Sequence, residues 1–393
     1  MMQKLKTQID ADIVVVGAGL VGLAAAIAFR KQGKNVVLVD ASKSETKLKK
    51  AWDERVYALA PATETWLKEL TVWEGVDKSR INDINAMHIW NAEAALALAD
   101  SDANLPKLGV IIENQNLQHA LWQQIKTLGV TVVTDAQCTS LHNMPNDIQF
   151  DVWLASQGDM TIAAKLIVAA DGVNSWLRNQ SNIAVKHKSF NQTAIVANFI
   201  VEKNHGNIAR QWFASHDTLA LLPLPNKHVS MVWSVSTEKA DKLLKLSNEQ
   251  LAEQVQAQSQ GVLGDLKPVG KTLSFELNQQ TATKLIADRM VLVGDAAHQI
   301  HPMAGQGVNL GFRDVMKLIE LTTKCMDVGD FNLLRQYERA RASDIATMNT
   351  LTAGLDYLFA SDKMLVKKVT IWGLQQLNKQ AAIKKLLIQQ VAA

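Results

Sequence analysis

The feature that most constrains the fold is a glycine-rich turn between an apolar strand and a helix near the start of the chain. The order is strand, glycine turn, helix and second strand, over residues 12–16, 17–22, 23–31 and 35–39. The second strand ends at Asp40. This order predicts a parallel α/β unit whose first turn binds a dinucleotide, because a G-x-G-x-x-G sequence is informative only between a strand and a helix.

Each polar or glycine position of this unit has a physical role in that prediction. Gly17 permits the tight turn, Gly19 lets the backbone approach a pyrophosphate, and Gly22 allows close packing of helix on strand. Leu20 belongs to the same loop, and Asp40 can accept hydrogen bonds from an adenosine ribose. An acid at that position argues against a ribose 2′-phosphate. The alternative is an ordinary glycine turn in a parallel sheet.

A second stretch, residues 289–311, repeats the design with the sequence RMVLVGDAAHQIHPMAGQGVNLG. An apolar strand ends at Gly294 and Asp295, which places a carboxylate at the carboxyl edge of the sheet, where such sheets bind ligands. Gly305 and Gly307 then leave backbone N–H groups open at a predicted helix N-terminus. Such donors suit a pyrophosphate or the electron-rich edge of a flavin ring.

A third element, residues 165–178 (KLIVAADGVNSWLR), is a hydrophobic strand followed by Asp171 and a glycine. Alone it would indicate only a turn. In this order and spacing, the three motifs resemble those of the FAD-dependent aromatic hydroxylases of the p-hydroxybenzoate hydroxylase type, over most of the chain. The resemblance implies bound FAD, NAD(P)H as reductant and O2 as co-substrate.

Further segments resemble the ubiquinone-biosynthesis branch of these hydroxylases. They are Asp53 to Ala60, Val72-Trp73, Ile111 to Asn114, Leu117-Gln118, Gln211 to Phe213, Leu219 to Pro223, and Tyr337 to Arg341 with Asp344. The family commonly has Gly-Pro before the Leu-Ala-Leu-Leu-Pro run, where this chain has Asp217-Thr218. The branch implies hydroxylation of a polyprenylated phenol through a flavin C4a-hydroperoxide.

The resemblance also assigns site residues by position. Arg55 and Gln118 would contact the cofactor, Asp171 would lie near its pyrophosphate, and Asp295 would hold the ribitol. The remaining cofactor-binding positions are Gly294, Gly307, Val308 and Asn309. The loop implied to face the isoalloxazine contains Pro302, Gly305, Gln306, Gly307 and Val308. No proton-transfer residue is assigned, because an electron-rich phenol requires little general base.

The predicted fold class is α/β, with a Rossmann-like FAD-binding domain, an inserted β-sheet substrate domain and a C-terminal helical segment. The FAD-binding domain is discontinuous, over residues 1–75, 109–180 and 283–325. Residues 76–108 and 181–282 form the substrate domain, and residues 326–393 form the C-terminal helical region. Within the substrate domain, residues 193–201, 219–222 and 228–235 have strand patterns.

The candidate substrate pocket rests on side chains of these strands, namely Gln211, Phe213, Leu221, Pro223 and Trp233. Apolar residues on strands are more often core than ligand contacts, so core packing is the alternative. A His-x-x-His pair, His298 and His301, lacks further ligands at usual metal spacing, and no metal is predicted.

The composition limits the kinds of partner and the cellular compartment that we expect for this protein. There are 41 Lys and Arg against 38 Asp and Glu, for a net charge of +3, which does not indicate nucleic acid. Two widely separated cysteines are typical of a reducing cytoplasm. The apolar run over residues 13–29 is shorter than the roughly 20 residues of a membrane span and contains the glycine turn.

The C-terminal stretch 363–390 has an amphipathic, basic pattern. This pattern favours a helix packed on the protein itself, and peripheral contact with the inner face of the membrane or with partner hydroxylases is the alternative. Two functional alternatives stay open from the sequence. One is another FAD-dependent oxidoreductase on the same scaffold, and the other is a non-catalytic flavoprotein that organises a biosynthetic complex.

Overall fold

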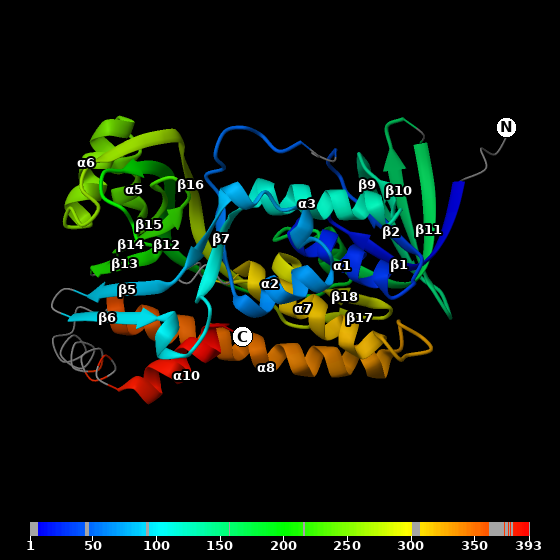
Figure 1. Cartoon of the computed structure of the whole chain (residues 1–393). Helices are drawn as coiled ribbons and strands as arrows, with labels where there is room; N and C mark the ends of the chain where they lie inside the picture. Colours follow the sequence, from blue (N-terminus) through cyan, green and yellow to red (C-terminus); the bar gives the residue numbers. More distant parts are fainter. Residues whose placement is uncertain are drawn as a thin grey trace.

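The computed structural model describes residues 7–43, 47–91, 94–156, 158–214, 217–300 and 307–360, together with 373, 376, 378 and 380–392. The chain forms two lobes, each built on a large sheet, with a small third sheet between them (Figure 1). The predicted α/β fold class is confirmed, including C-terminal helices.

The first lobe is built on a largely parallel sheet in the order β17-β18-β11-β1-β2-β8. Its strands are β1 (Thr7–Val16), β2 (Val36–Val39), β8 (Thr131–Val133), β11 (Gly158–Ala169), β17 (Ile286–Ala287) and β18 (Met290–Leu292). Strands β9 (Ala136–Asn143) and β10 (Ile148–Leu154) extend it antiparallel to β11. Val16 lies level with Val39 and Ala169, and Ala169 lies level with Leu292, so four parallel strands end at one edge.

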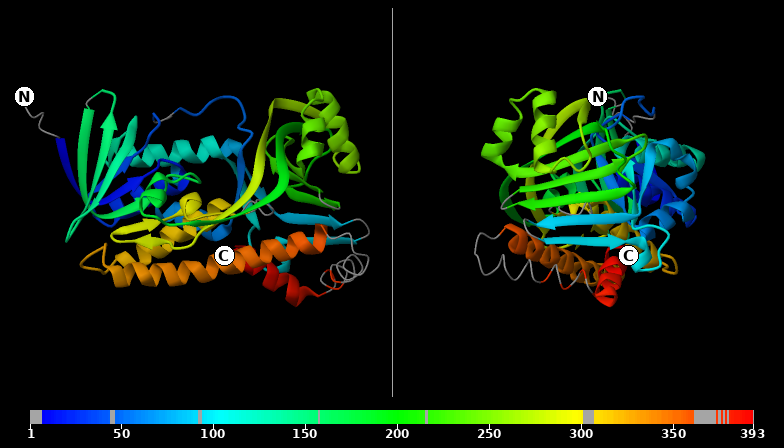
Figure 2. Two further views of the ribbon diagram at one scale, coloured as in Figure 1. Left: turned by 180° about the vertical axis from the view of Figure 1, so that it is seen from behind. Right: turned by 60° about the vertical axis from the view of Figure 1, so that its left-hand side comes forward.

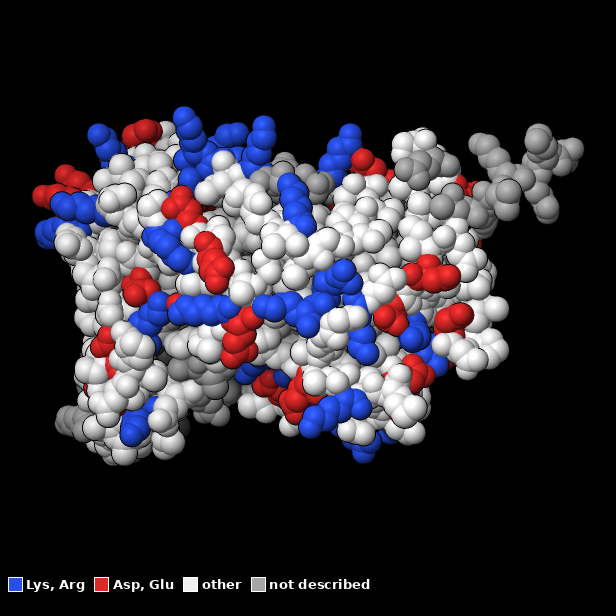
Figure 3. Space-filling view, turned by 45° about the vertical axis from the view of Figure 1, so that its right-hand side comes forward, with Lys and Arg blue, Asp and Glu red and all other residues white. Residues whose placement is uncertain are grey.

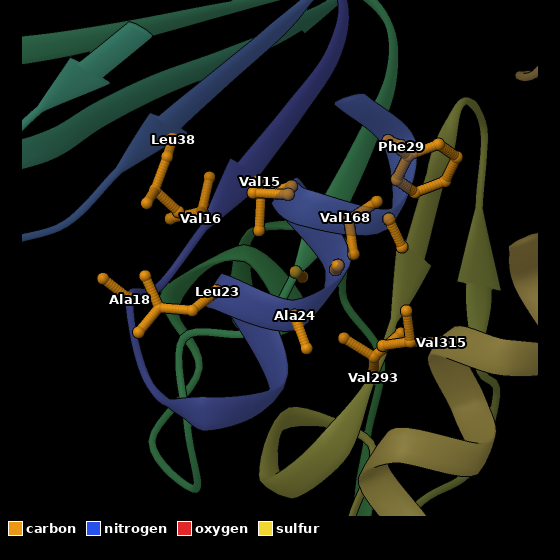
Figure 4. Packing of buried hydrophobic residues seen from close by; sticks show 14 of the residues in the cluster. Val15, Val16, Ala18, Leu23, Ala24, Phe29, Leu38, Val168, Val293 and Val315 are labelled. Atoms are coloured by element: carbon orange, nitrogen blue, oxygen red, sulfur yellow. The ribbon is translucent and has the colours of Figure 1, made fainter. Parts of the chain in front are cut away.

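Helices cover this sheet and complete its core. They are α1 (Leu20–Lys31), α2 (Pro61–Glu69), α3 (Asn114–Thr127), α4 (Trp176–Gln180) and α7 (Gly307–Thr322). Helix α1 is rich in alanine and buried along most of its length, so it can lie close to the strands. Leu23 and Ala24 of α1, Val168 of β11 and Val315 of α7 belong to one buried cluster (Figure 4).

The second lobe is a mainly antiparallel sheet in the order β19-β16-β12-β15-β14-β13-β5-β6. Its strands are β5 (Ala86–Asn91), β6 (Ala94–Ala99), β12 (Val185–Val201), β13 (Ile208–Ala214), β14 (Asp217–Leu224), β15 (His228–Ser236), β16 (Leu266–Ala282) and β19 (His298–Gln299). Helices α5 (Thr237–Leu243) and α6 (Asn248–Gln258) pack on one face, over a core that includes Ile195 and Trp233. Ser247 caps α6 together with Gln250.

The small sheet joins the lobes through β3 (Val56–Leu59), β7 (Gly109–Glu113) and β4 (Ile81–Ile84). Helix α8 (Phe331–Ala360) runs along the lower side of both lobes, and α10 (Ala381–Ala392) lies beneath β6 (Figure 2). No helix in the described part of the chain is both long and apolar enough to span a bilayer. Basic and acidic side chains are interspersed over the face in Figure 3.

Candidate active site

A cavity of about 600 Å³ opens where the two lobes meet. Its first wall carries many residues of the motifs identified in the sequence, namely Gly19, Leu20, Gly22, Arg55, Gln118, Gly172, Asp295, Gly307 and Val308. Its second wall belongs to the second sheet and contains Met87, Ala209, Gln211, Thr218, Ala220, Leu222, Val232 and Ser234. Loops that are far apart in the sequence therefore face one another across a single space.

The glycines of the first turn are needed for two different reasons. Gly17 has φ +106°, and a Cβ there would lie 2.2 Å from the Ala170 carbonyl oxygen. A Cβ on Gly22 would lie 1.9 Å from the Gly17 carbonyl oxygen. At Gly19, by contrast, a Cβ meets nothing within 4 Å. The fold itself therefore requires Gly17 and Gly22, whereas Gly19 borders open space in the cavity.

Asp40 closes the turn through backbone hydrogen bonds. Its Oδ2 accepts from the Ala18 N–H at 2.5 Å, and its Oδ1 accepts from the Ser42 N–H at 2.7 Å. A carboxylate can accept about four hydrogen bonds, so these two contacts leave acceptor capacity for a ribose. Asp40 thus holds the glycine turn in place and keeps acceptor capacity at the end of β2.

The loop that carries Asp171 is tied to the loop that carries Asp295. Arg178 donates from Nη2 to the Val173 carbonyl at 2.9 Å and from Nη1 to the Ala296 carbonyl at 3.0 Å. Asp171 Oδ2 accepts from the Leu177 N–H at 3.1 Å, while its Oδ1 is buried and has no partner in the described part of the chain. An orphaned acceptor at this edge fits a donor supplied by a bound cofactor.

Asp295 lies on the cavity wall at the end of β18, in the short helical turn Gly294–Ala296. Solvent reaches the Asp295 side chain through the cavity. Enclosure by the surrounding protein nevertheless raises the pKa of the Asp295 carboxyl, and attraction from His298 and Arg55 opposes that rise. Gly294 has φ +59°, and a Cβ there would approach Val21 of α1 at 3.2 Å. This glycine therefore sets the turn that presents Asp295.

The segment that brings Arg55 to the cavity is held in place by the ion pair between Glu113 and Arg80. Glu113, which is fully buried, accepts from the Asp53 N–H at 2.6 Å and from Arg80 Nε at 2.7 Å. Arg80 also donates to the carbonyls of Lys49 and Ala51 at 2.9 Å. Glu113 lies in a segment that entered only through resemblance, and no sequence pattern singles out Arg80.

A buried charge network behind Asp295 is the largest feature that the sequence analysis missed. The fully buried Asp314 of α7 accepts from His298 Nε2 at 2.7 Å, from Arg341 Nε at 2.7 Å and from the Gly294 N–H at 2.9 Å. Desolvation raises the pKa of Asp314, but its interactions with His298, Arg341 and the Gly294 N–H outweigh that effect, so the carboxyl's pKa lies below its ordinary value. The network ties α7 and α8 to the Asp295 turn.

The start of α7 contributes to the cavity in two ways. Gly307 and Val308 line it directly. Asn309 instead bridges to β3, donating to the Ala58 carbonyl at 2.8 Å and accepting from the Ala60 N–H at 3.0 Å. Its amide therefore positions the helix. Three predicted flavin-facing residues, Pro302, Gly305 and Gln306, lie outside the described residues.

The structure separates the predicted substrate-pocket residues. Gln211 lines the cavity, whereas Leu221 and Trp233 lie in the core between the sheet and helices α5 and α6. Pro223 is buried outside the cavity lining, and Phe213 borders a separate groove beside Trp90 and Trp212. Alternate residues of a strand point to opposite faces. The neighbours Thr218, Ala220, Leu222, Val232 and Ser234 accordingly take the cavity positions.

These observations fit a bound dinucleotide that carries a flavin. The glycine turn leaves room for a pyrophosphate at the N-terminus of α1, which favours anions. Acceptors stand at the ends of β2, β11 and β18, and the N-terminus of α7 faces the same cavity. Within the described ranges, no group of three or more His, Cys, Asp and Glu side chains could hold a metal ion.

Comparisons with known proteins agree with this geometry. Residues 10–351 match the family model described as FAD binding domain. Ubiquinone hydroxylase UbiL of Rhodospirillum rubrum is 31% identical over 386 residues, covering 96% of this chain and 89% of that protein. The 3-demethoxyubiquinol 3-hydroxylase of Escherichia coli is 31% identical, with 89% of each chain covered. In fold, p-nitrophenol 4-monooxygenase PnpA from Pseudomonas putida superposes with a TM-score of 0.80 at 15% identity, covering 98% of both chains.

The chain belongs to the FAD-binding-domain family and is an FAD-dependent monooxygenase. Within that family, it belongs with the ubiquinone-biosynthesis hydroxylases, which confirms the resemblance seen in the sequence. Its cofactor is FAD, with NAD(P)H as the reductant and O2 as the co-substrate.

Proposed function

We propose that this protein hydroxylates the aromatic ring of a polyprenylated phenol in ubiquinone biosynthesis. The observation that carries the proposal is the single cavity in which the candidate FAD loops of the first lobe face the second sheet. The names of the relatives support the substrate class, since they include a ubiquinone hydroxylase and a demethoxyubiquinol hydroxylase.

The candidate FAD contacts follow the cavity from one end to the other. The loop Gly17–Gly22 and Asp40 would hold the adenosine and pyrophosphate end, with Asp171 close by. Asp295 would accept from the ribitol, and Arg55, Gln118, Gly307 and Val308 would face the flavin. When bound and reduced, FAD reacts with O2 and supplies the oxygen atom that the ring receives.

The protein's contribution is orientation and exclusion of water. On the second wall, Met87, Ala209, Ala220, Leu222 and Val232 provide an apolar surface for a ring. Backbone N–H groups at the N-terminus of α7 would stabilise negative charge on the flavin, each by about 0.3–2 kcal/mol. Arg55 places a positive charge at the same cavity. Arg80 and Glu113 fix its position by holding the segment that precedes it.

A polyprenyl tail also calls for access from a membrane, and we propose peripheral contact with the inner face through the C-terminal segment 363–390. Most of residues 361–379 lie outside the described residues. In α10, Leu386 is 64% exposed and Leu387 37% exposed beside the exposed Lys385, while Ile388 is buried against the protein. Exposed leucines next to a lysine suit an anionic lipid surface.

The membrane proposal is tested by replacing both exposed leucines with glutamate. We expect Leu386→Glu with Leu387→Glu to weaken binding to vesicles containing anionic lipid at least about fivefold, because the apolar contact is lost and the added negative charges are repelled by the lipid. Leu244→Glu is the matched control, since that leucine is 41% exposed on the α5 side of the second lobe. Equal vesicle binding by the double variant and the wild type would reject the proposal.

The function is tested by mass spectrometry of quinone precursors in a strain that lacks this gene. We expect one polyprenylated phenol to accumulate that is a single oxygen atom short of the next intermediate. An unchanged precursor profile would contradict the proposal. Substrate-dependent NAD(P)H oxidation by the purified protein separates a hydroxylase from a flavoprotein that only organises other enzymes.

A further inference from the structure

Two hydroxyl side chains stand side by side on the otherwise largely apolar second wall of the cavity. Thr218 of β14 and Ser234 of β15 are directly opposite one another in the antiparallel register, and both line the cavity. Side chains opposite one another on such strands have Cβ atoms about 4.5–5.5 Å apart. The two hydroxyls can therefore reach the same atom of a ligand.

Both hydroxyls are open to a ligand in the part of the chain that the structure describes. Ser234 is 6% exposed, and among the described residues neither Ser234 nor Thr218 has a side-chain hydrogen-bond partner. The residues directly opposite them on this face are Phe213 and Ala194, and the cavity-lining residues next along each strand are Ala220 and Val232; none of these four side chains can form a hydrogen bond. An enclosed hydroxyl without a partner is costly, so its partner is expected to be a ligand or a water that a ligand displaces.

The first two residues of β14 point to opposite faces of the sheet. Asp217 pairs with Lys239 of α5, while Thr218 lines the cavity. The start of β14 therefore places a hydroxyl group in the cavity and keeps the acid out of it.

We propose that Thr218 and Ser234 together recognise an oxygen substituent on the aromatic ring of the substrate. The pair can donate to and accept from a phenol hydroxyl, which fixes the orientation of the ring on the apolar wall. This inference rests on the proposed function for its substrate class. It gives the two residues a role in substrate specificity and none in the transfer of oxygen to the ring.

The test is binding of two probes to the FAD-loaded protein. The first probe is a phenol with one short isoprenoid chain, and the second is the same molecule with the ring hydroxyl replaced by hydrogen. We expect the wild type to bind the phenol at least about tenfold more tightly, because a site built for a hydroxyl rejects its absence. Thr218→Val and Ser234→Ala should each weaken phenol binding about three- to tenfold. Binding of the deoxy probe should stay within about twofold.

Thr193→Val is the matched control, because Thr193 lies on β12 and faces the opposite side of the same sheet. It should change neither affinity. Equal affinity of the wild type for both probes, or unchanged phenol affinity in both variants, would overturn the inference. Either variant alone suffices if the other fails to fold.

Product analysis separates this inference from the proposed function. If the wild type hydroxylates the phenol and both variants keep its KM and affinity, only the recognition role fails. If the pair discriminates between the probes and no ring hydroxylation occurs with any phenol tested, recognition stands and the proposed function fails.

Discussion

Replacing Gly19 with valine should separate FAD binding from folding. Gly19 has φ −70° and ψ 177°, an extended conformation that valine also adopts. A Cβ at this position meets nothing within 4 Å. We therefore expect the free energy of unfolding of the apoprotein to change by less than about 1 kcal/mol, as for other substitutions that meet no neighbour.

FAD binding should respond very differently, because the side chain would occupy the space proposed for the pyrophosphate. Loss of one charge-assisted hydrogen bond and of the interaction with the helix N-terminus amounts to about 2–4 kcal/mol. This corresponds to a dissociation constant about 30- to 1,000-fold higher. Titration of apoprotein with FAD, followed by flavin fluorescence, measures it.

Gly22→Ala is the control for this prediction. Its Cβ would lie 1.9 Å from the Gly17 carbonyl oxygen, so it should destabilise the apoprotein itself, by about 1–3 kcal/mol or more. The reasoning is refuted if Gly19→Val binds FAD as tightly as the wild type. It is equally refuted if Gly19→Val loses as much apoprotein stability as Gly22→Ala.

Two further predictions concern Asp295 and Asp314. Asp295→Ala should weaken FAD binding by about 1.5–3 kcal/mol, measured by the same titration. Because the pKa of Asp295 is raised, wild-type affinity should begin to fall at a pH above the ordinary aspartate value, and the variant should lack this dependence. Asp314→Asn should destabilise the fold by about 3–5 kcal/mol in chemical denaturation, since it removes the buried negative charge that faces Arg341 and His298. The folded pKa of Asp314 lies below the unfolded value of about 3.9. The wild-type advantage should therefore be complete above about pH 4 and shrink as the pH falls through the folded pKa, and a constant advantage down to pH 2 would contradict this account.

The parts of the site that local chemistry determines could be predicted from the sequence. The positive φ of Gly17 and the contact of Gly22 with the Gly17 carbonyl are set within the turn, and an acid after a buried strand, such as Asp295, is placed by the sheet edge. Such positions depend on a few neighbouring residues. Arg55 and Gln118 entered through resemblance, because the folding of distant segments brings them to the cavity.

The sequence pattern does not show which side chains of β14 and β15 point to the cavity, because both faces of this sheet are covered. Leu221 packs under α5 and α6, while Leu222 lines the cavity, so apolar residues occupy consecutive positions. A strand covered on both faces has no alternation to identify its ligand side. Trp233 belongs to the core for the same reason, and its neighbour Ser234 takes the cavity position.

The network around Asp314 is a long-range feature with one local signal. Asp314 is the only acid among the buried positions of α7, whose other buried residues include Leu310, Phe312 and Val315. An acid on an apolar helix face predicts a buried partner. Which residues act as the partners of Asp314, here Arg341 and His298, depends on how α8 and the Asp295 turn pack on α7.

The central claim, that one cavity holds FAD beside a phenol and delivers oxygen to its ring, is tested most directly with isotopically labelled O2. Purified FAD-loaded protein is supplied with NAD(P)H and a prenylated phenol, and the product is analysed by mass spectrometry. The account predicts one labelled oxygen atom on the aromatic ring. Consumption of NAD(P)H with labelled hydrogen peroxide and no labelled phenol product would contradict it.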